Sequence, residues 1–229
     1  MDFSKFESKI NLNFKNKNLL KQAFTHRSYI NENPEAGEHN ERLEFLGDAV
    51  LELVITKHLF DKYSDKTEGE LTSYRSGLVN TNALSDAASR LGMNDFLLLS
   101  KGESKDTGRA RQYILANTFE ALIGAIYIDS GYDAAYNFIA ENIFSFVENV
   151  VLKKLWKDAK SLLQEKSQDI EGITPHYKLI KEYGPDHLKR FIVGIYIGEE
   201  LIGEGEGLSK QEAEQSAALN GLKKRGWNK

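Results

Sequence analysis

The chain has 229 residues, a formal net charge of −4 and 41% hydrophobic residues, enough apolar material for one large or two small folded domains. It contains no cysteine, which excludes disulfides and thiolate zinc sites and leaves carboxylates, amides and five histidines as candidate metal ligands. No apolar run approaches the ~20 residues of a membrane span, and the N-terminal residues are too polar for a secretory signal, so we expect a cytoplasmic protein.

The first part of the chain has a helical pattern. Up to about Ile143, apolar residues recur every three or four positions in long segments that short polar stretches separate. We expect helices over roughly residues 18–25, 41–60, 67–76, 80–91, 111–127 and 132–149. Turn-forming residues predict loops over 31–37 and 101–108. The pattern therefore indicates an all-helical domain.

The pattern changes in the last third of the chain. Asp158 is a suitable N-cap for a helix that Gly172 ends. Residues 191–197 alternate as a strand, residues 201–206 form a returning strand, and residues 210–224 form a last helix. The order helix, three strands, helix predicts a compact α+β unit of ~70 residues, large enough to fold alone. We place a linker at 151–157, between domains of residues 1–150 and 158–229.

The two parts differ in charge. Residues 1–150 contain 16 basic and 22 acidic residues, a balance of −6, whereas residues 151–229 contain 14 and 12, a balance of +2. An acidic domain is unsuited to contact phosphates unless its acids hold cations, while the basic part permits a polyanionic partner.

Three carboxylates share one face of the helix predicted over 41–60. At 100° per residue, Glu41, Glu44 and Asp48 fall at about 0°, −60° and −20°. Carboxylates crowded in this way bind cations, pair with bases such as Arg42, or face solvent, and spacing alone does not choose between these. If they bind a cation, oxygen-only ligands favour magnesium or manganese.

A second helix repeats the arrangement. Asn117 and Glu120 lie three residues apart on a strongly apolar helix, hence on one face. Two such helices packed side by side would combine four oxygen ligands. Glu68 stands at a predicted helix start, where spacing alone favours a simpler role in stabilising the helix dipole.

The sequence of residues 40–51, Asn-Glu-Arg-Leu-Glu-Phe-Leu-Gly-Asp-Ala-Val-Leu, resembles the signature of the ribonuclease III family. Residues 23–29, 78–80 and 114–127 also resemble that family, in the right order, and residues 158–226 resemble its C-terminal double-stranded RNA-binding domain. The fold implied is an all-α ribonuclease III endonuclease domain followed by a small α-β-β-β-α RNA-binding domain.

The resemblance also implies site residues. The metal-binding positions of the family correspond to Glu44, Asp48, Asn117 and Glu120, and the catalytic positions to Asp48, Glu120, Glu41 and Glu68. Position 117 departs from the typical bacterial pattern, which has Asp there. An amide oxygen can coordinate magnesium, but it brings no negative charge.

The activity implied is magnesium-dependent hydrolysis of phosphodiester bonds in double-stranded RNA, leaving 5′-phosphate and 3′-hydroxyl ends, in processing of ribosomal and other structured RNA precursors. Manganese can substitute for magnesium, and no organic cofactor or membrane is expected. The family works as a homodimer, and Phe45 corresponds to its aromatic contact across the two-fold axis. Taken alone, Phe45 is as well explained as an ordinary core residue.

The resemblance assigns RNA contacts to three segments of the C-terminal domain. Gln164 and Glu165 on its first helix would reach 2′-hydroxyls, His187 lies in a loop expected to enter the minor groove, and Ser209 and Lys210 begin the last helix beside phosphates. The family often has two lysines where this chain has Lys210 and Gln211, which weakens the phosphate contact. His187 alone would be read as an ordinary surface histidine.

Two other functions stay open. The first is a double-stranded RNA-binding protein with weak or no cleavage because of Asn117. The second is a small-molecule metal-dependent hydrolase built on the helical domain, which would leave the C-terminal module without a role.

Overall fold

The computed structural model describes residues 2–152, 159–185 and 189–227. The chain divides into two compact units, Met1–Trp156 and Lys157–Lys229, and each has a hydrophobic core of its own. Helix α9 runs to Leu152, and residues 153–158, with the predicted N-cap Asp158, lie outside the described part. The exact limits of the linker therefore stay a prediction.

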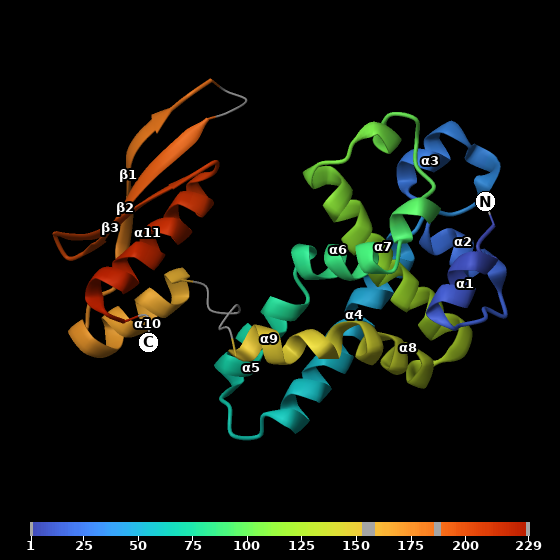
Figure 1. Ribbon diagram of the computed structural model, residues 1–229, viewed down its shortest axis with the longest axis horizontal. Helices are drawn as coiled ribbons and strands as arrows, with labels where there is room; N and C mark the ends of the chain where they lie inside the picture. Colours follow the sequence, from blue (N-terminus) through green and yellow to red (C-terminus); the bar gives the residue numbers. More distant parts are fainter. Residues whose placement is uncertain (1, 153–158, 186–188, 228–229) are drawn as a thin grey trace. The chain divides into compact units, whose positions relative to one another are not determined.

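The described part of the first unit is helical, as predicted (Figure 1). Its helices are α1 (Ser4–Ile10), α2 (Lys17–Ala23), α3 (Arg27–Glu32), α4 (Glu41–Lys62), α5 (Glu68–Leu78), α6 (Thr81–Arg90), α7 (Arg109–Ser130), α8 (Tyr132–Ile139) and α9 (Ser145–Leu152). The helical ranges predicted from periodicity agree with α2 and α4 to α7 within two or three residues at most ends.

Helices α4 and α7, each of 22 residues, pack along one another at the centre of this unit. In α7 nearly every side chain from Ile114 to Ile126 is buried, because the helix is covered on most sides. Asn117 and Glu120 are the two residues of this stretch that keep partial exposure. A polar pair on a helix that is otherwise apolar all round marks the place where this helix reaches solvent.

Four segments of the first unit differ from the prediction. The predicted loop 31–37 contains the end of α3 and a 3-10 turn at Pro34–Ala36, and the loop 101–108 contains a 3-10 turn at Glu103–Lys105. Helix α1 was not predicted. The helix predicted over 132–149 is interrupted by a π-helical turn, Ala140–Phe144, between α8 and α9.

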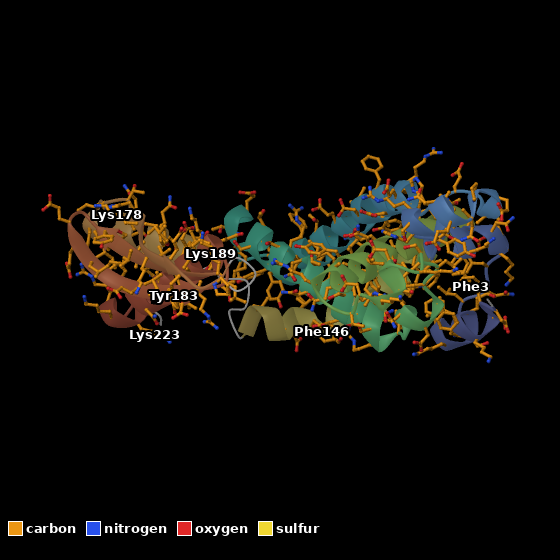
Figure 2. All side chains as sticks on the ribbon, turned by 90° about the horizontal axis from the view of Figure 1, so that it is seen from above. Phe3, Phe146, Lys178, Tyr183, Lys189 and Lys223 are labelled. Atoms are coloured by element: carbon orange, nitrogen blue, oxygen red, sulfur yellow. The ribbon has the colours of Figure 1, made fainter. Side chains whose placement is uncertain are left out.

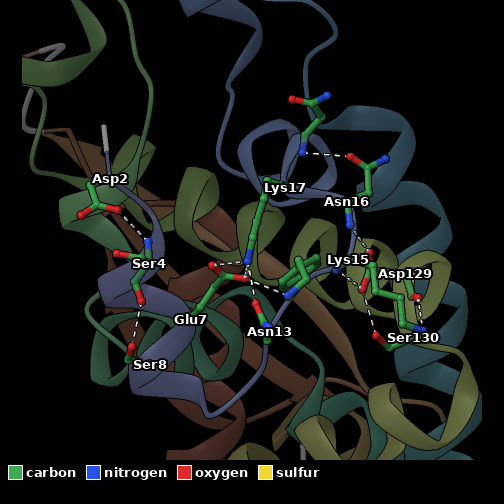
Figure 3. A network of polar contacts seen from close by, with 12 residues as sticks. Asp2, Ser4, Glu7, Ser8, Asn13, Lys15, Asn16, Lys17, Asp129 and Ser130 are labelled. Carbon is green, nitrogen blue, oxygen red and sulfur yellow. Dashed lines mark hydrogen bonds and ion pairs between the residues drawn. The ribbon is translucent and has the colours of Figure 1, made fainter.

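The N-terminal helices are held to the unit by a buried carboxylate (Figure 3). Glu7 on α1 is 7% exposed, accepts a hydrogen bond from the Phe14 backbone N–H at 2.7 Å, and pairs with the Lys17 Nζ at 2.6 Å. Asp129, at the end of α7, accepts from the backbone N–H groups of Lys15 and Asn16. Specific hydrogen-bond donors thus compensate the negative charge of both carboxylates.

The second unit contains α10 (Ala159–Glu171), strands β1 (His176–Tyr183), β2 (Arg190–Ile197) and β3 (Glu200–Gly207), and α11 (Lys210–Arg225). The strands form an antiparallel sheet in the order β1-β2-β3. Ile195, Ile197 and Ile202 of the sheet pack against Leu163 of α10 and Leu222 of α11. The predicted order of helix, three strands and helix is confirmed.

The sheet and α11 approach each other closely because β3 presents glycines to the helix. A side chain at Gly205 would overlap the backbone of Ala217, so only glycine permits this spacing. Charged side chains such as Lys178 on β1 and Lys223 on α11 cover the surface of the second unit (Figure 2). Across the residues that the structure describes, no helix is long and apolar enough to cross a membrane.

Candidate active site

The candidate site lies where α4 crosses α7. Gly47 faces the backbone of α7, and a side chain there would overlap the carbonyl oxygen of Glu120. Gly124 faces α4 in the same way, and its side chain would overlap the carbonyl oxygen of Leu43. The two helices therefore touch backbone to backbone, which brings the polar residues beside these glycines together.

Four of the predicted site residues are neighbours at this crossing. Glu44 and Asp48 flank Gly47 on α4, and Asn117 and Glu120 come from α7. Glu44, Asn117 and Glu120 are half-buried, whereas Asp48 is exposed. The packing of α4 against α7 therefore places these four oxygen-bearing side chains near one another.

Glu120 has the most perturbed ionisation of these residues. Burial is the main cause that raises its pKa from 4.5 to about 8, and three carboxylates of α4 raise it further, in the order Asp48, Glu44 and Glu52. The ionised form is disfavoured because it is poorly solvated and faces like charges. A carboxyl group in this condition is stabilised when a cation joins the cluster.

The α4 carboxylates are perturbed in the same direction. Burial and the charge of Glu41 raise the pKa of Glu44, while a side-chain hydrogen bond from Asn117 lowers it. Burial and the charge of Glu52 raise the pKa of Asp48. The amide of Asn117 therefore acts as a donor that partly compensates the charge of Glu44.

The cluster consists only of carboxylate and amide oxygens, the hard ligands that magnesium and manganese take. In the described part of the chain, no three histidine or acidic side chains already converge closely enough to hold one metal ion together. The donor set therefore suits the cation in its chemistry, and the side chains would have to rotate to complete a coordination geometry.

Glu41 and Glu68 lie outside this group of four. Glu41 is exposed at the start of α4, 3.6 Å from the Arg27 guanidinium, and reaches the cluster only through its charge on Glu44. Glu68 is exposed in the first turn of α5, accepts a hydrogen bond from the Thr72 hydroxyl, and lines a separate cavity of about 470 Å³. The fold of one chain does not bring Glu68 to the cluster.

Phe45 is not a core residue. Its side chain is 81% exposed on the outer side of α4, and Leu53 and Phe60 on the same helix are 58% and 67% exposed. This outward apolar face of α4, defined by Phe45, Leu53 and Phe60, adjoins the cavity that Glu68 lines, since Phe60 lines it too. Exposed apolar patches of this kind mark interaction surfaces.

The predicted RNA contacts of the second unit are exposed where the structure describes them. Gln164 and Glu165 lie on the outer side of α10, and Lys210 opens α11. The Ser209 hydroxyl caps α11 by accepting from the Glu212 backbone N–H at 3.2 Å, so part of its role is structural. His187 lies outside the described residues.

The sequence-based prediction did not include Glu52, which lies on α4 next to the cluster. It lies four residues after Asp48 on α4, and its charge acts on both Asp48 and Glu120. The signal was present, since four-residue spacing from Asp48 keeps it on the face of the other acids. The mid-helix glycines Gly47 and Gly124 were the second missed signal, because they reveal which helix faces meet.

Comparison with known families gives two matches that together cover most of the chain. The family described as Ribonuclease-III-like matches residues 16–147. The double-stranded RNA binding motif matches residues 159–225. The boundary between the two matches falls in the region where the structure divides into units.

Individual relatives are similar over nearly their whole length. Proteins named Ribonuclease 3 from Borreliella burgdorferi and Carboxydothermus hydrogenoformans are 45% and 46% identical, over 96% and 94% of this chain and 90% and 92% of theirs. A solved nuclease domain of ribonuclease III from Campylobacter jejuni, described as flexible in a region involved in dimer formation, is 39% identical with a TM-score of 0.56, and the match covers 62% of this chain and 98% of that one.

Proposed function

Because the chain belongs to the ribonuclease III family and is an endoribonuclease for double-stranded RNA, we propose that it cleaves with magnesium held by Glu44, Asp48 and Glu120. Its products would carry 5′-phosphate and 3′-hydroxyl ends, and its substrates would be ribosomal and other structured RNA precursors in the cytoplasm. The observation that carries this proposal is the meeting of these carboxylates with Asn117 where α4 crosses α7.

Magnesium suits the donor set, and manganese would replace it, because both take oxygen ligands. When bound, the ion supplies an activated water and neutralises charge on the phosphate oxygens. Glu44, Asp48 and Glu120 would bind it as carboxylates, with the Asn117 amide oxygen as a neutral ligand. Glu120 holds a proton near neutral pH in the chain alone, so it has to release that proton to become a ligand.

Two further roles belong to this proposal. Asp48 and Glu120 would also accept and pass on protons during the reaction, and Glu41, which pairs with Arg27, would act on the cluster through its charge on Glu44. Glu68 would join a reaction centre only across a subunit interface, since within one chain it lines a separate cavity. Each of these roles is a proposal for mutagenesis.

We propose a homodimer formed through the outward apolar face of α4. Phe45 is 81% exposed, which is unfavourable for a large aromatic ring unless a partner covers it. Phe60, which belongs to this face, also lines a cavity. The face therefore has both a protruding ring and a concave surface, as a self-complementary interface requires. Sedimentation would test this, because Phe45→Glu should yield monomers.

The second unit would carry the RNA affinity. Gln164 and Glu165 on α10 would contact 2′-hydroxyls, and Ser209 and Lys210 at the start of α11 would contact phosphates, with His187 in the intervening loop. Residues 158–229 alone should then bind an RNA duplex in preference to the same DNA duplex. Equal affinity for both would argue against the 2′-hydroxyl contacts.

One observation favours a second candidate function, duplex binding with weak or no cleavage. The Asn117 side chain, which lowers the pKa of Glu44, brings no charge to the cluster, so the cation site is less negative than four carboxylates would make it. In this alternative the nuclease unit would serve as a dimerising scaffold for the RNA-binding unit.

The experiment is cleavage of a duplex of defined sequence by the parent chain and by Glu120→Gln, with the ends of the products determined by mass spectrometry. The parent should yield 5′-phosphate and 3′-hydroxyl ends in magnesium. The variant should lose most cleavage and retain duplex binding measured in calcium, because only the cation site changes. Undiminished cleavage by the variant would contradict the metal assignment.

A further inference from the structure

Glu52 on α4 has no role in the function proposed above. Its side chain is half-buried, four residues after Asp48 and eight after Glu44, so one side of α4 carries all three acids. Within the described ranges, Glu52 makes no ion pair or hydrogen bond, whereas Glu7, which is also shielded from solvent, is compensated by Lys17 and the Phe14 N–H. An uncompensated acid in a partly buried position is unfavourable unless a cation is supplied.

Glu52 is electrostatically connected to the cluster at the helix crossing. Glu52 follows Asp48 by four residues, so the two side chains are neighbours one turn apart on the same side of α4, the helix that packs along α7. The carboxylate of Glu52 thus adds to the negative potential around Asp48.

The number of negative charges in the cluster indicates a role for Glu52. Of the four oxygen side chains at the crossing, the amide of Asn117 is the neutral one, so the set carries three negative charges when ionised. Glu52 restores a fourth. We infer that Glu52 supplies the cation site with the negative charge that the Asn117 amide lacks, and thereby sets its affinity for magnesium. This inference rests on the proposed function, because it takes the cluster to be a cation site.

The expected effect is measurable without RNA. Removing one charge near a divalent ion in a partly solvated site weakens binding roughly tenfold. Glu52→Gln should therefore raise the dissociation constant for magnesium about tenfold, and Asn117→Asp should lower it by a similar factor. The double variant should return close to the parent, because the charge has only moved from α4 to α7.

Isothermal titration of the metal-free full chain with magnesium chloride at pH 8.5, above the raised pKa of Glu120, measures these constants directly. Glu141→Gln is the control, because it removes one acid from the same unit, and Glu141 is exposed and has no partner among the described side chains. It should bind magnesium as the parent does. Cleavage rate against magnesium concentration for the same variants provides a second readout, which should shift in the same order.

Two results would overturn the inference. If Glu52→Gln binds magnesium as tightly as Glu141→Gln does, Glu52 is only a solvated acid, and the proposed cation site survives. If the parent binds no magnesium and Glu120→Gln titrates identically, the cation site itself fails and the role of Glu52 fails with it. The parent and Glu120→Gln titrations distinguish the two failures.

Discussion

Replacing Glu120 with Gln should make the metal-free protein more stable at alkaline pH while it disables the proposed site. The group has a pKa raised from 4.5 to about 8 by burial and by neighbouring acids. A raised folded-state pKa contributes stability below the unfolded value, and this contribution is lost as pH rises through the folded value. The free energy of unfolding of the first unit should therefore fall between about pH 5 and pH 8. The glutamine variant should lack this decrease, because its amide does not ionise.

The magnitude follows from the same shift. At 1.36 kcal/mol per pKa unit, the full shift corresponds to roughly 5 kcal/mol, and screening by the solvent that reaches the half-buried side chain reduces this to about 2 kcal/mol. Glu44 and Asp48, whose pKa values are also raised, add a smaller loss in the same direction to both proteins.

Calorimetric unfolding in EDTA at pH 5, 6.5 and 8 measures the difference, with the two units followed as separate transitions. The variant should exceed the parent by about 2 kcal/mol at pH 8 and match it near pH 5. Added magnesium should stabilise the parent at pH 8 more than the variant, because the ionised cluster binds the ion. Equal pH slopes for parent and variant would refute the electrostatic reasoning.

Three further substitutions test the helix and sheet packing and one ion pair of the two units. Gly47→Ala should destabilise the first unit by about 3 kcal/mol in urea unfolding, because its methyl group would overlap the Glu120 carbonyl, whereas Gly69→Ala, in open space on α5, should be neutral or slightly stabilising. Gly205→Ala should unfold the second unit and abolish duplex binding while the first unit keeps its thermal transition. Lys17→Met should cost about 2 kcal/mol, since it leaves the buried Glu7 carboxylate without its cation; a smaller loss than in Glu7→Gln would contradict this.

Much of the fold follows from the sequence because its signals are local. The period of apolar residues over 41–60 and 111–127 is that of α4 and α7, and Gly172 ends α10 with φ at +70° as a helix-terminating glycine does. The alternation over 191–197 likewise gives β2. Each of these segments is long enough, or well enough terminated, for its own residues to determine its structure.

The remainder depends on contacts that a single segment does not encode. Short α3, which was not predicted, forms because His26 caps it and Leu98 pairs with Thr25 just before it. The helical spacing predicted that Glu41 lies beside Glu44 and Asp48. In the structure Glu41 is exposed at the start of α4 and pairs with Arg27. The contact between Gly47 and Gly124 decides which residues of α7 meet the α4 acids, and it is a property of the packed helices.

This chain should turn over double-stranded RNA with a cation held where α4 crosses α7. The most direct measurement is multiple-turnover cleavage of a long RNA duplex by catalytic amounts of the full chain in magnesium, in manganese and in EDTA. Many cleavages per protein chain are expected with either ion and none in EDTA. Stoichiometric duplex binding without cleavage at any magnesium or manganese concentration, or cleavage that persists in EDTA, would contradict it.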